Sequence, residues 1–194
     1  MIFPNFLIIG ANKGGTSSFY VYLSQHPEIF MSEIKEPMFF LFDKENEKSN
    51  KAVDSKEPKW ENWKHVTSVD EYKKMFVAPT GIKAAGEAST AYLANPQCAA
   101  RIHEFNPKMK IIAILRNPVS RAFSNYLMYV RIGHESKSFS KVIKEELNGK
   151  RDYLPQGRHY LQLGFYHDSL RTYINTFGKE NVKIYLIEEL KEKP

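Results

Sequence analysis

The feature that most constrains this chain is a short apolar run that ends in a glycine-rich loop near the N-terminus. Residues Phe6–Gly10 read FLIIG, an apolar run closed by glycine that is typical of a strand buried on both faces. Residues 16–25 carry apolar side chains at helical spacing, and Pro27 follows where a helix would stop. The sequence therefore predicts a strand, a glycine loop and a helix in succession.

Strand-like and helix-like segments alternate along the rest of the chain. Further strands are predicted over residues 82–87, 110–115 and 182–187, with helices over residues 68–76, 96–105, 118–130, 138–147 and 166–177. Such alternation predicts an α/β fold in three layers, a mainly parallel sheet flanked by helices on both faces. With its strand–loop–helix opening, the predicted fold class is P-loop-like.

Local signals add detail at the helix starts and in one long connection. Ser68 and Glu71 have the spacing of a capping box. Asn117 can cap the next long helix, whose first turn would hold Pro118. Residues 43–65 are polar and rich in Lys and Glu, so we predict a surface excursion there and a candidate flap over a site.

Length, charge and cysteine content limit the class of protein. At 194 residues the chain fits one domain over residues 1–194. The net charge of +6 favours anionic partners, but scattered Lys and Arg residues argue against nucleic acid. A single Cys98 allows no internal disulfide, and the N-terminal apolar run is too short to span a membrane. We expect a soluble, cytoplasmic protein without a membrane span, and the oligomeric state stays open.

The loop over residues 10–18 (GANKGGTSS) has the composition of an anion-binding site. Gly14 and Gly15 allow the backbone to curl around a tetrahedral anion, Lys13 supplies charge, and hydroxyl donors follow at Thr16, Ser17 and Ser18. The loop is not a Walker A motif, because Thr16 stands where that motif has its lysine. Taken alone, the loop could also be a glycine turn with a solvated lysine.

A second candidate anion-binding site lies after the predicted strand 110–115. Arg116 follows the strand directly, and Ser124 lies in the helix behind it, on the face that it shares with Ser120. We expect this face to lie opposite a buried apolar stripe made of Val119, Ala122, Phe123, Tyr126, Leu127 and Val130. A helix cap with a surface salt bridge is the alternative. Two such anion-binding sites predict a ligand with two separated anionic ends.

Two segments carry a resemblance to a known family. FLIIGANKGGTSSFYVYLSQHPEIFMSEIKEPMFF and IIAILRNPVSRAFSNY resemble the sulfotransferases that use 3′-phosphoadenosine 5′-phosphosulfate (PAPS). The likeness is greatest to the branch of heparan-sulfate sulfotransferases and their bacterial relatives. It implies that Lys13 through Ser18 hold the 5′-phosphosulfate of PAPS and that Arg116 and Ser124 hold its 3′-phosphate. It also implies adenosine 3′,5′-bisphosphate as the product, and no metal.

Glu36 is the candidate general base for transfer to an acceptor hydroxyl or amine, with Lys13 stabilising the leaving phosphate. We expect Pro37 to hold Glu36 extended and the apolar run 38–42 to shield it from water. The resemblance assigns the role of base to Glu36. From the residues alone, Glu36 could equally pair with Lys35 or cap a helix, and Glu87 is the second candidate base.

The acceptor is the least constrained part of the prediction. Besides Glu36 and Glu87, candidate acceptor contacts are Tyr92 and His134, and the acceptor would be a small molecule or a glycan. Ala88 and Thr90 stand where glycan-sulfating relatives often have Lys and Pro, which puts a sulfated glycan in doubt. Relatives also continue beyond this length, which leaves open whether the domain lacks their C-terminal segment. Two alternatives stay open, a Mg²⁺-dependent phosphoryl transferase and a non-catalytic module that binds nucleotides or polyanions.

Overall fold

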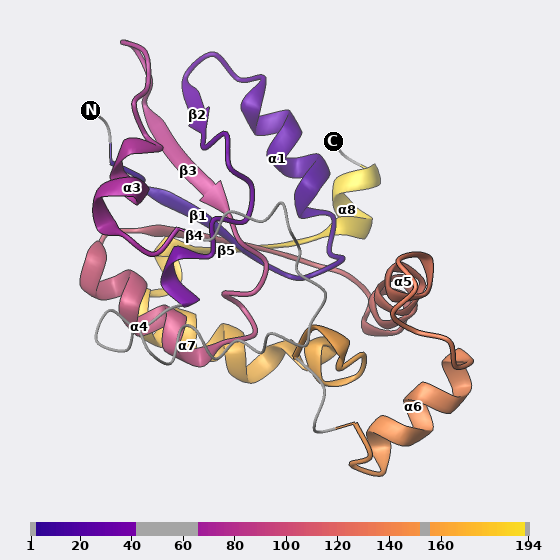
Figure 1. Cartoon of the computed structure of the whole chain (residues 1–194). Coiled ribbons are helices and arrows are strands. Elements are labelled where there is room, and N and C mark those ends of the chain that lie inside the picture. Colours follow the sequence, from indigo (N-terminus) through magenta and orange to yellow (C-terminus); the bar gives the residue numbers. More distant parts are fainter. Residues whose placement is uncertain (1–2, 42–65, 152–155, 193–194) are drawn as a thin grey trace.

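The computed structural model describes residues 3–41, 66–151 and 156–192, and within them one five-stranded sheet runs through the molecule (Figure 1). Its strand order is β2-β3-β1-β4-β5, and every adjacent pair is parallel. The strands are β1 (Phe6–Gly10), β2 (Ile29–Met31), β3 (Ala84–Ala88), β4 (Lys110–Leu115) and β5 (Val182–Leu186). The predicted parallel α/β sheet is confirmed.

Helices cover both faces of this sheet and one end of it (Figure 1). They are α1 (Thr16–Ser24), α3 (Val69–Lys74), α4 (Pro96–Phe105), α5 (Pro118–Arg131), α6 (Phe139–Leu147), α7 (Tyr166–Phe177) and α8 (Ile187–Glu192). The described residues contain no helix that is both long and apolar enough to cross a membrane.

Strand β1 lies at the centre of the fold and divides the core into two apolar clusters. Leu7 and Ile9 point to the side of α3, α4 and α7, where Tyr72, Ile102 and Tyr173 are fully buried. Phe6 and Ile8 point to the other side, against Phe19, Tyr20 and Leu23 of α1 and Ile187 and Leu190 of α8. Because successive strand residues face opposite sides, this alternation produces the three predicted layers.

Three short elements were not predicted or differ from prediction. Strand β2 has only three residues and lies at the sheet edge, which is too short for a periodic signal. Helix α8 begins at Ile187, a residue that the sequence assigned to the last strand. Ser68 precedes α3, but its side chain makes no capping hydrogen bond, so the predicted capping box does not form.

Helix α5 starts as predicted but buries a different face. Asn117 accepts hydrogen bonds from the backbone N–H groups of Val119 and Ser120, as expected of a cap. The predicted buried stripe is wrong, since Val119 is 72% exposed and Phe123, Leu127 and Val130 are exposed too. The buried residues of α5 are Arg121, Ala122, Asn125 and Tyr129.

The reason lies in what α5 packs against. The helix stands at the carboxyl end of the sheet (Figure 1) and contacts the segment around residues 156–164 through polar side chains. Arg121 donates to the carbonyl of Tyr160, and Asn125 donates to the carbonyl of Gly157 at 2.9 Å. The spacing of apolar residues in the sequence cannot predict buried polar contacts of this kind.

Candidate active site

The site begins at the carboxyl end of β1, where the chain turns into the glycine loop. The N–H of Ala11 donates to the carbonyl of Ile114 in β4 at 2.8 Å, and the N–H of Gly14 donates to the carbonyl of Ala11 at 2.8 Å. A Cβ atom on Gly14 would lie 2.3 Å from the Ile114 carbonyl oxygen. The loop therefore lies against β4 so closely that residue 14 has to be glycine.

Gly15 then leads into helix α1 from a conformation that side chains avoid. Its φ of +96° lies in the left-handed region, and a Cβ there would approach Cδ1 of Ile187 to 2.5 Å. Thr16 begins α1, whose first turn carries no acidic residue. The free N–H groups at the start of the helix thus face the loop without a competing carboxylate, an arrangement suited to an anion.

Residues of both predicted anion-binding sites line a single cleft of about 570 Å³. The predicted residues that line it are Lys13, Gly15, Thr16, Ser17, Ser18, Glu36, Arg116 and Ser124. Gly14 is buried on the side of the loop that packs against β4. Segments more than 100 residues apart in the sequence therefore meet in one cavity because the parallel strands end at the same edge.

The charges of this cleft are strongly unbalanced. Among its described lining residues, Lys13, Lys35, Arg116 and Lys191 are cationic, and Glu36 is the one carboxylate. Such an excess of positive charge inside a concave surface attracts and concentrates anions.

Lys13 experiences this excess directly. Burial lowers the pKa of the Lys13 ammonium, and the nearby cations Arg131, Arg116 and Lys35 lower it further. A bound anion would offset that repulsion, so occupation of the cleft by a phosphate or sulfate group would return the pKa of Lys13 towards its ordinary value.

Backbone strain is concentrated at this cleft. Within the described ranges, the non-glycine residues with a positive φ are Lys13, at 64°, Glu36, at 59°, and Met38, at 55°. All three line the cavity. A non-glycine residue in such a backbone conformation costs about 1–3 kcal/mol of free energy. These conformations persist where surrounding contacts enforce them, often at functional sites.

Glu36 is therefore not in the extended conformation that Pro37 predicts. Its N–H donates to the carbonyl of Ala88 at 2.9 Å, and the N–H of Met38 donates to Oγ of Ser89 at 3.1 Å. These two bonds from the end of β3 hold the segment in its left-handed turn. Of the following run, Met38, Phe39 and Phe40 are buried as expected, Leu41 is partly buried, and Phe42 lies outside the described residues.

The Glu36 carboxylate is 11% exposed and is held from two sides. Oγ1 of Thr90 donates to it at 3.2 Å from Oε1 and 3.1 Å from Oε2, and Nζ of Lys35 lies 3.3 Å from Oε1. The predicted alternative, a pair with Lys35, is thus present. It coexists with a position on the cleft wall, so the pairing does not remove Glu36 from the site.

Glu87 lies behind the cleft and not on its wall. It is fully buried in β3, where Oγ of Ser89 donates to its Oε2 at 2.9 Å. Burial raises the pKa of Glu87 to about 8, and the hydrogen bonds from Tyr92 and Ser89 only partly oppose this rise. The expected acceptor contact through Glu87 is wrong, because no solvent-accessible surface of this residue remains for a ligand.

The other two expected acceptor contacts are also corrected. Tyr92 is fully buried, with its hydroxyl 3.4 Å from the Phe40 N–H, so it belongs to the core. His134 follows the end of α5, where its N–H donates to the Tyr129 carbonyl, and it is absent from the described cleft lining. The candidate flap over residues 43–65 lies outside the described residues.

Several lining residues were missed by the sequence prediction. Asn12, Lys35, Thr90 and Lys191 all face the cleft. Lys35 and Thr90 adjoin residues that the sequence had singled out, so their neighbourhood was a usable signal. Lys191 lies on the unpredicted helix α8, and nothing in its local sequence indicated a site. Among the described residues, no three His, Cys, Asp or Glu side chains cluster as a metal site would require.

Fold and cleft together define an α/β protein with a cationic cleft at the carboxyl edge of its parallel sheet. A family model described as the sulfotransferase family matches residues 4–162. The chain belongs to this sulfotransferase family.

Solved and curated relatives agree with this membership. A crystal structure of a sulfotransferase from Alicyclobacillus acidocaldarius is 35% identical, with a TM-score of 0.84, covering 100% of this chain and 77% of that one. The membrane-associated sulfotransferase kil1 of Dictyostelium discoideum is 30% identical over 74% of this chain and 28% of its own length. Human carbohydrate sulfotransferase 15 is 26% identical over 96% of this chain and 40% of its own. The chain thus spans less than half of these curated relatives.

Proposed function

We propose that this protein transfers a sulfuryl group from PAPS to a hydroxyl or amine acceptor. The observation that carries the proposal is the meeting of Lys13, Arg116 and Glu36 in one cationic cleft. Membership of the sulfotransferase family supports the same reaction class.

The residues of the cleft fit a donor with two anionic ends. The loop after β1 places Gly15 and the first residues of α1 on the wall of the cleft, so backbone N–H groups there can approach a phosphosulfate closely. Lys13 and the hydroxyls of residues 16–18 would hold that end. Arg116 and Ser124 would hold the 3′-phosphate, for which a guanidinium and a hydroxyl are suitable partners. A volume of about 570 Å³ lies within the range of ligand sites.

PAPS supplies a sulfuryl group attached to a phosphate leaving group. In the proposed transfer, the sulfur–oxygen bond to that phosphate would break, and a new bond would form from sulfur to the acceptor oxygen or nitrogen, whose proton would pass to Glu36. Lys13 and the N-terminus of α1 stabilise the charge that remains on the phosphate. Thr90 and Lys35 orient the Glu36 carboxylate at the cleft wall.

The test is turnover of PAPS labelled in its sulfuryl group, with a pooled panel of hydroxyl and amine acceptors. We expect label to appear in an acceptor, and we expect EDTA to leave the rate unchanged. Glu36→Gln should reduce turnover by about 10²–10⁴-fold, the range for loss of a general base, while adenosine 3′,5′-bisphosphate still binds. Phosphoryl transfer from ATP that EDTA abolishes would instead support the kinase-like alternative. Nucleotide binding without turnover would support a binding module.

A further inference from the structure

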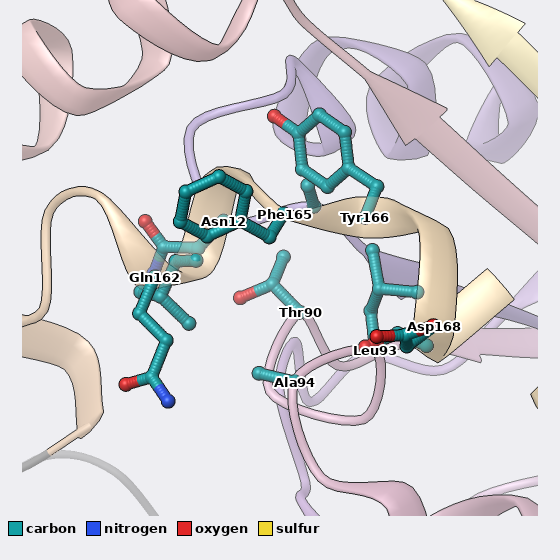
Figure 2. A pocket seen from close by; sticks show the side chains of 11 residues that line it. Asn12, Thr90, Leu93, Ala94, Gln162, Phe165, Tyr166 and Asp168 are labelled. Atoms are coloured by element: carbon teal, nitrogen blue, oxygen red, sulfur yellow. The ribbon is translucent and has the colours of Figure 1, made fainter.

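A second, smaller cavity of about 250 Å³ adjoins the donor cleft (Figure 2). Three segments line it, residues 11–12 after β1, residues 90–94 after β3, and the stretch 162–169 that enters α7. We propose that this cavity is the acceptor subsite and that it takes an uncharged polyhydroxyl group, of the size of one neutral sugar unit. The proposal rests on the sulfuryl-transfer function and specifies the acceptor of that site.

The position of the cavity is the first argument. Asn12 and Thr90 line both cavities, so the two spaces share a wall. Oγ1 of Thr90 lies 3.1 Å from Oε2 of Glu36 on the donor side of that wall. A ligand in the second cavity therefore lies next to the residue that holds the assigned base, and one of its hydroxyls would have to extend past Thr90 to reach the Glu36 carboxylate.

The second argument is charge. The described lining of this cavity contains no Lys and no Arg, and its charged member is Asp168. That carboxylate lies 3.2 Å from Arg171 and 3.1 Å from Nδ1 of His167, both of which stand outside the lining. The donor cleft next to it has four cationic lining residues. A sulfated or carboxylated acceptor would find no cationic partner on the walls of this cavity, whereas a neutral acceptor needs none.

The third argument is the kind of side chains present. Figure 2 shows Thr90 near the middle of the view with Gln162, Phe165, Ala94 and Leu93 around it, and Asp168 also lines the cavity. Phe165 is 78% exposed and lines the cavity. A sugar ring presents an apolar C–H face that stacks on an aromatic ring, and its hydroxyls bond amide, hydroxyl and carboxylate groups. Apolar walls with a few placed polar groups are usual for small-ligand sites.

Volume restricts the acceptor further. About 250 Å³ is below the ~300–1,000 Å³ that drug-sized ligands occupy. One sugar unit would enter, and the rest of a larger acceptor would have to lie outside.

The wall that carries Phe165 is held in place without a ligand. Oxygens of Glu146 accept the N–H groups of Tyr160, Leu161 and Gln162 at 2.7, 2.9 and 3.0 Å. The buried Arg121 also donates to the Tyr160 carbonyl. Since these bonds fix the backbone in advance, an acceptor would not have to order this wall on binding, which favours affinity.

The test compares a neutral saccharide, N,N′-diacetylchitobiose (called chitobiose below), with a sulfated one, a heparan sulfate tetrasaccharide, on protein loaded with adenosine 3′,5′-bisphosphate. Saturation-transfer NMR measures binding, and labelled PAPS measures turnover. We expect chitobiose to bind at least tenfold more tightly than the tetrasaccharide. We expect Phe165→Ala and Gln162→Ala to raise the KM for chitobiose about tenfold or more, the effect of losing one good contact, with unchanged binding of the bisphosphate.

Phe3→Ala is the matched control, because Phe3 is also an exposed phenylalanine but lies beside α3, away from both cavities. It should leave KM unchanged. Preference for the sulfated saccharide, absence of chitobiose binding, or an unchanged KM in Phe165→Ala would each overturn the acceptor assignment while bisphosphate binding persists. If the unaltered protein did not bind adenosine 3′,5′-bisphosphate at all, this result would contradict the donor site, and with it the proposed function.

Discussion

The hydroxyl of Thr90 donates to both oxygens of the Glu36 carboxylate, at 3.1 and 3.2 Å, across 54 residues of sequence. Glu36 lies in a strained turn after β2, and Thr90 is the second residue after the end of β3. Since β2 and β3 are paired in the sheet, their ends bring these residues together at the wall of the donor cleft.

Removing this hydrogen bond should weaken catalysis more than donor binding. Thr90→Val keeps the shape of the side chain and removes the donor, so we expect kcat to fall about tenfold or more, since one charge-assisted bond contributes ~1.5–3 kcal/mol. Thr90→Ser should retain most of the activity. Steady-state kinetics with calorimetry of adenosine 3′,5′-bisphosphate would separate the two effects. Equal kcat in Thr90→Val and the unaltered protein would contradict the positioning role.

Lys13 is expected to act in the transition state. Lys13→Ala should reduce kcat by about 10²–10³-fold, the usual effect of removing one group that stabilises developing negative charge. Lys183→Ala, on the exposed face of β5, is the matched control and should leave turnover unchanged. An active Lys13→Ala variant would remove the loop lysine from the mechanism.

Gly15 and Gly81 allow a matched test of the loop. Both have a φ near +95°, but a Cβ on Gly81 meets nothing within 4 Å, whereas a Cβ on Gly15 would approach Ile187 to 2.5 Å. Gly81→Ala should therefore cost only the backbone strain, about 1–2 kcal/mol. Gly15→Ala should cost more and weaken nucleotide binding, and Ile187→Ala should restore part of both losses. Urea unfolding of Gly81→Ala, Gly15→Ala, Ile187→Ala and the double variant Gly15→Ala/Ile187→Ala measures this, and equal costs for the two glycines would contradict the contact.

Glu87 should make stability depend on pH. Burial raises the pKa of Glu87 from 4.5 to about 8, so the folded protein keeps a proton that the unfolded chain releases. The contribution of Glu87 to stability is then full below about pH 4.5 and declines as pH rises towards 8, by roughly 1.4 kcal/mol per pH unit at most.

Glu87→Gln replaces the neutral carboxyl with an amide of the same shape and has no proton to lose. We expect the difference in unfolding free energy between the unaltered protein and Glu87→Gln to shift against the unaltered protein between pH 5 and pH 8. Urea unfolding at pH 5, 6.5 and 8 measures it. A difference that stays constant over this range would show that Glu87 does not hold a proton in the folded state.

Parts of this architecture follow from local sequence, and others do not. The apolar runs of β1 and β4, the glycine loop and the Asn117 cap depend on neighbouring residues, so they were predictable. The buried face of α5 was not, because it is fixed by hydrogen bonds from Arg121 and Asn125 to a distant segment.

The site shows the same division. Lys13, Arg116 and Ser124 lie at strand ends or in the helices that follow, where the topology predicts a common edge. Thr90 and Lys191 reach the cleft only through tertiary packing. The burial of Glu87 and Tyr92 could not be predicted from the sequence either. The β3 segment is rich in small residues, and such a segment shows no periodic pattern that would indicate burial on both faces.

The most direct test of the account is the affinity ratio between AMP and adenosine 3′,5′-bisphosphate, measured by calorimetry. The two ligands differ only in the 3′-phosphate assigned to Arg116 and Ser124. We predict that the bisphosphate binds at least about tenfold more tightly, since one charge-assisted contact contributes ~1.5–3 kcal/mol, and that Arg116→Ala removes most of this difference. Equal affinity for AMP and the bisphosphate in the unaltered protein would contradict the two-ended donor site.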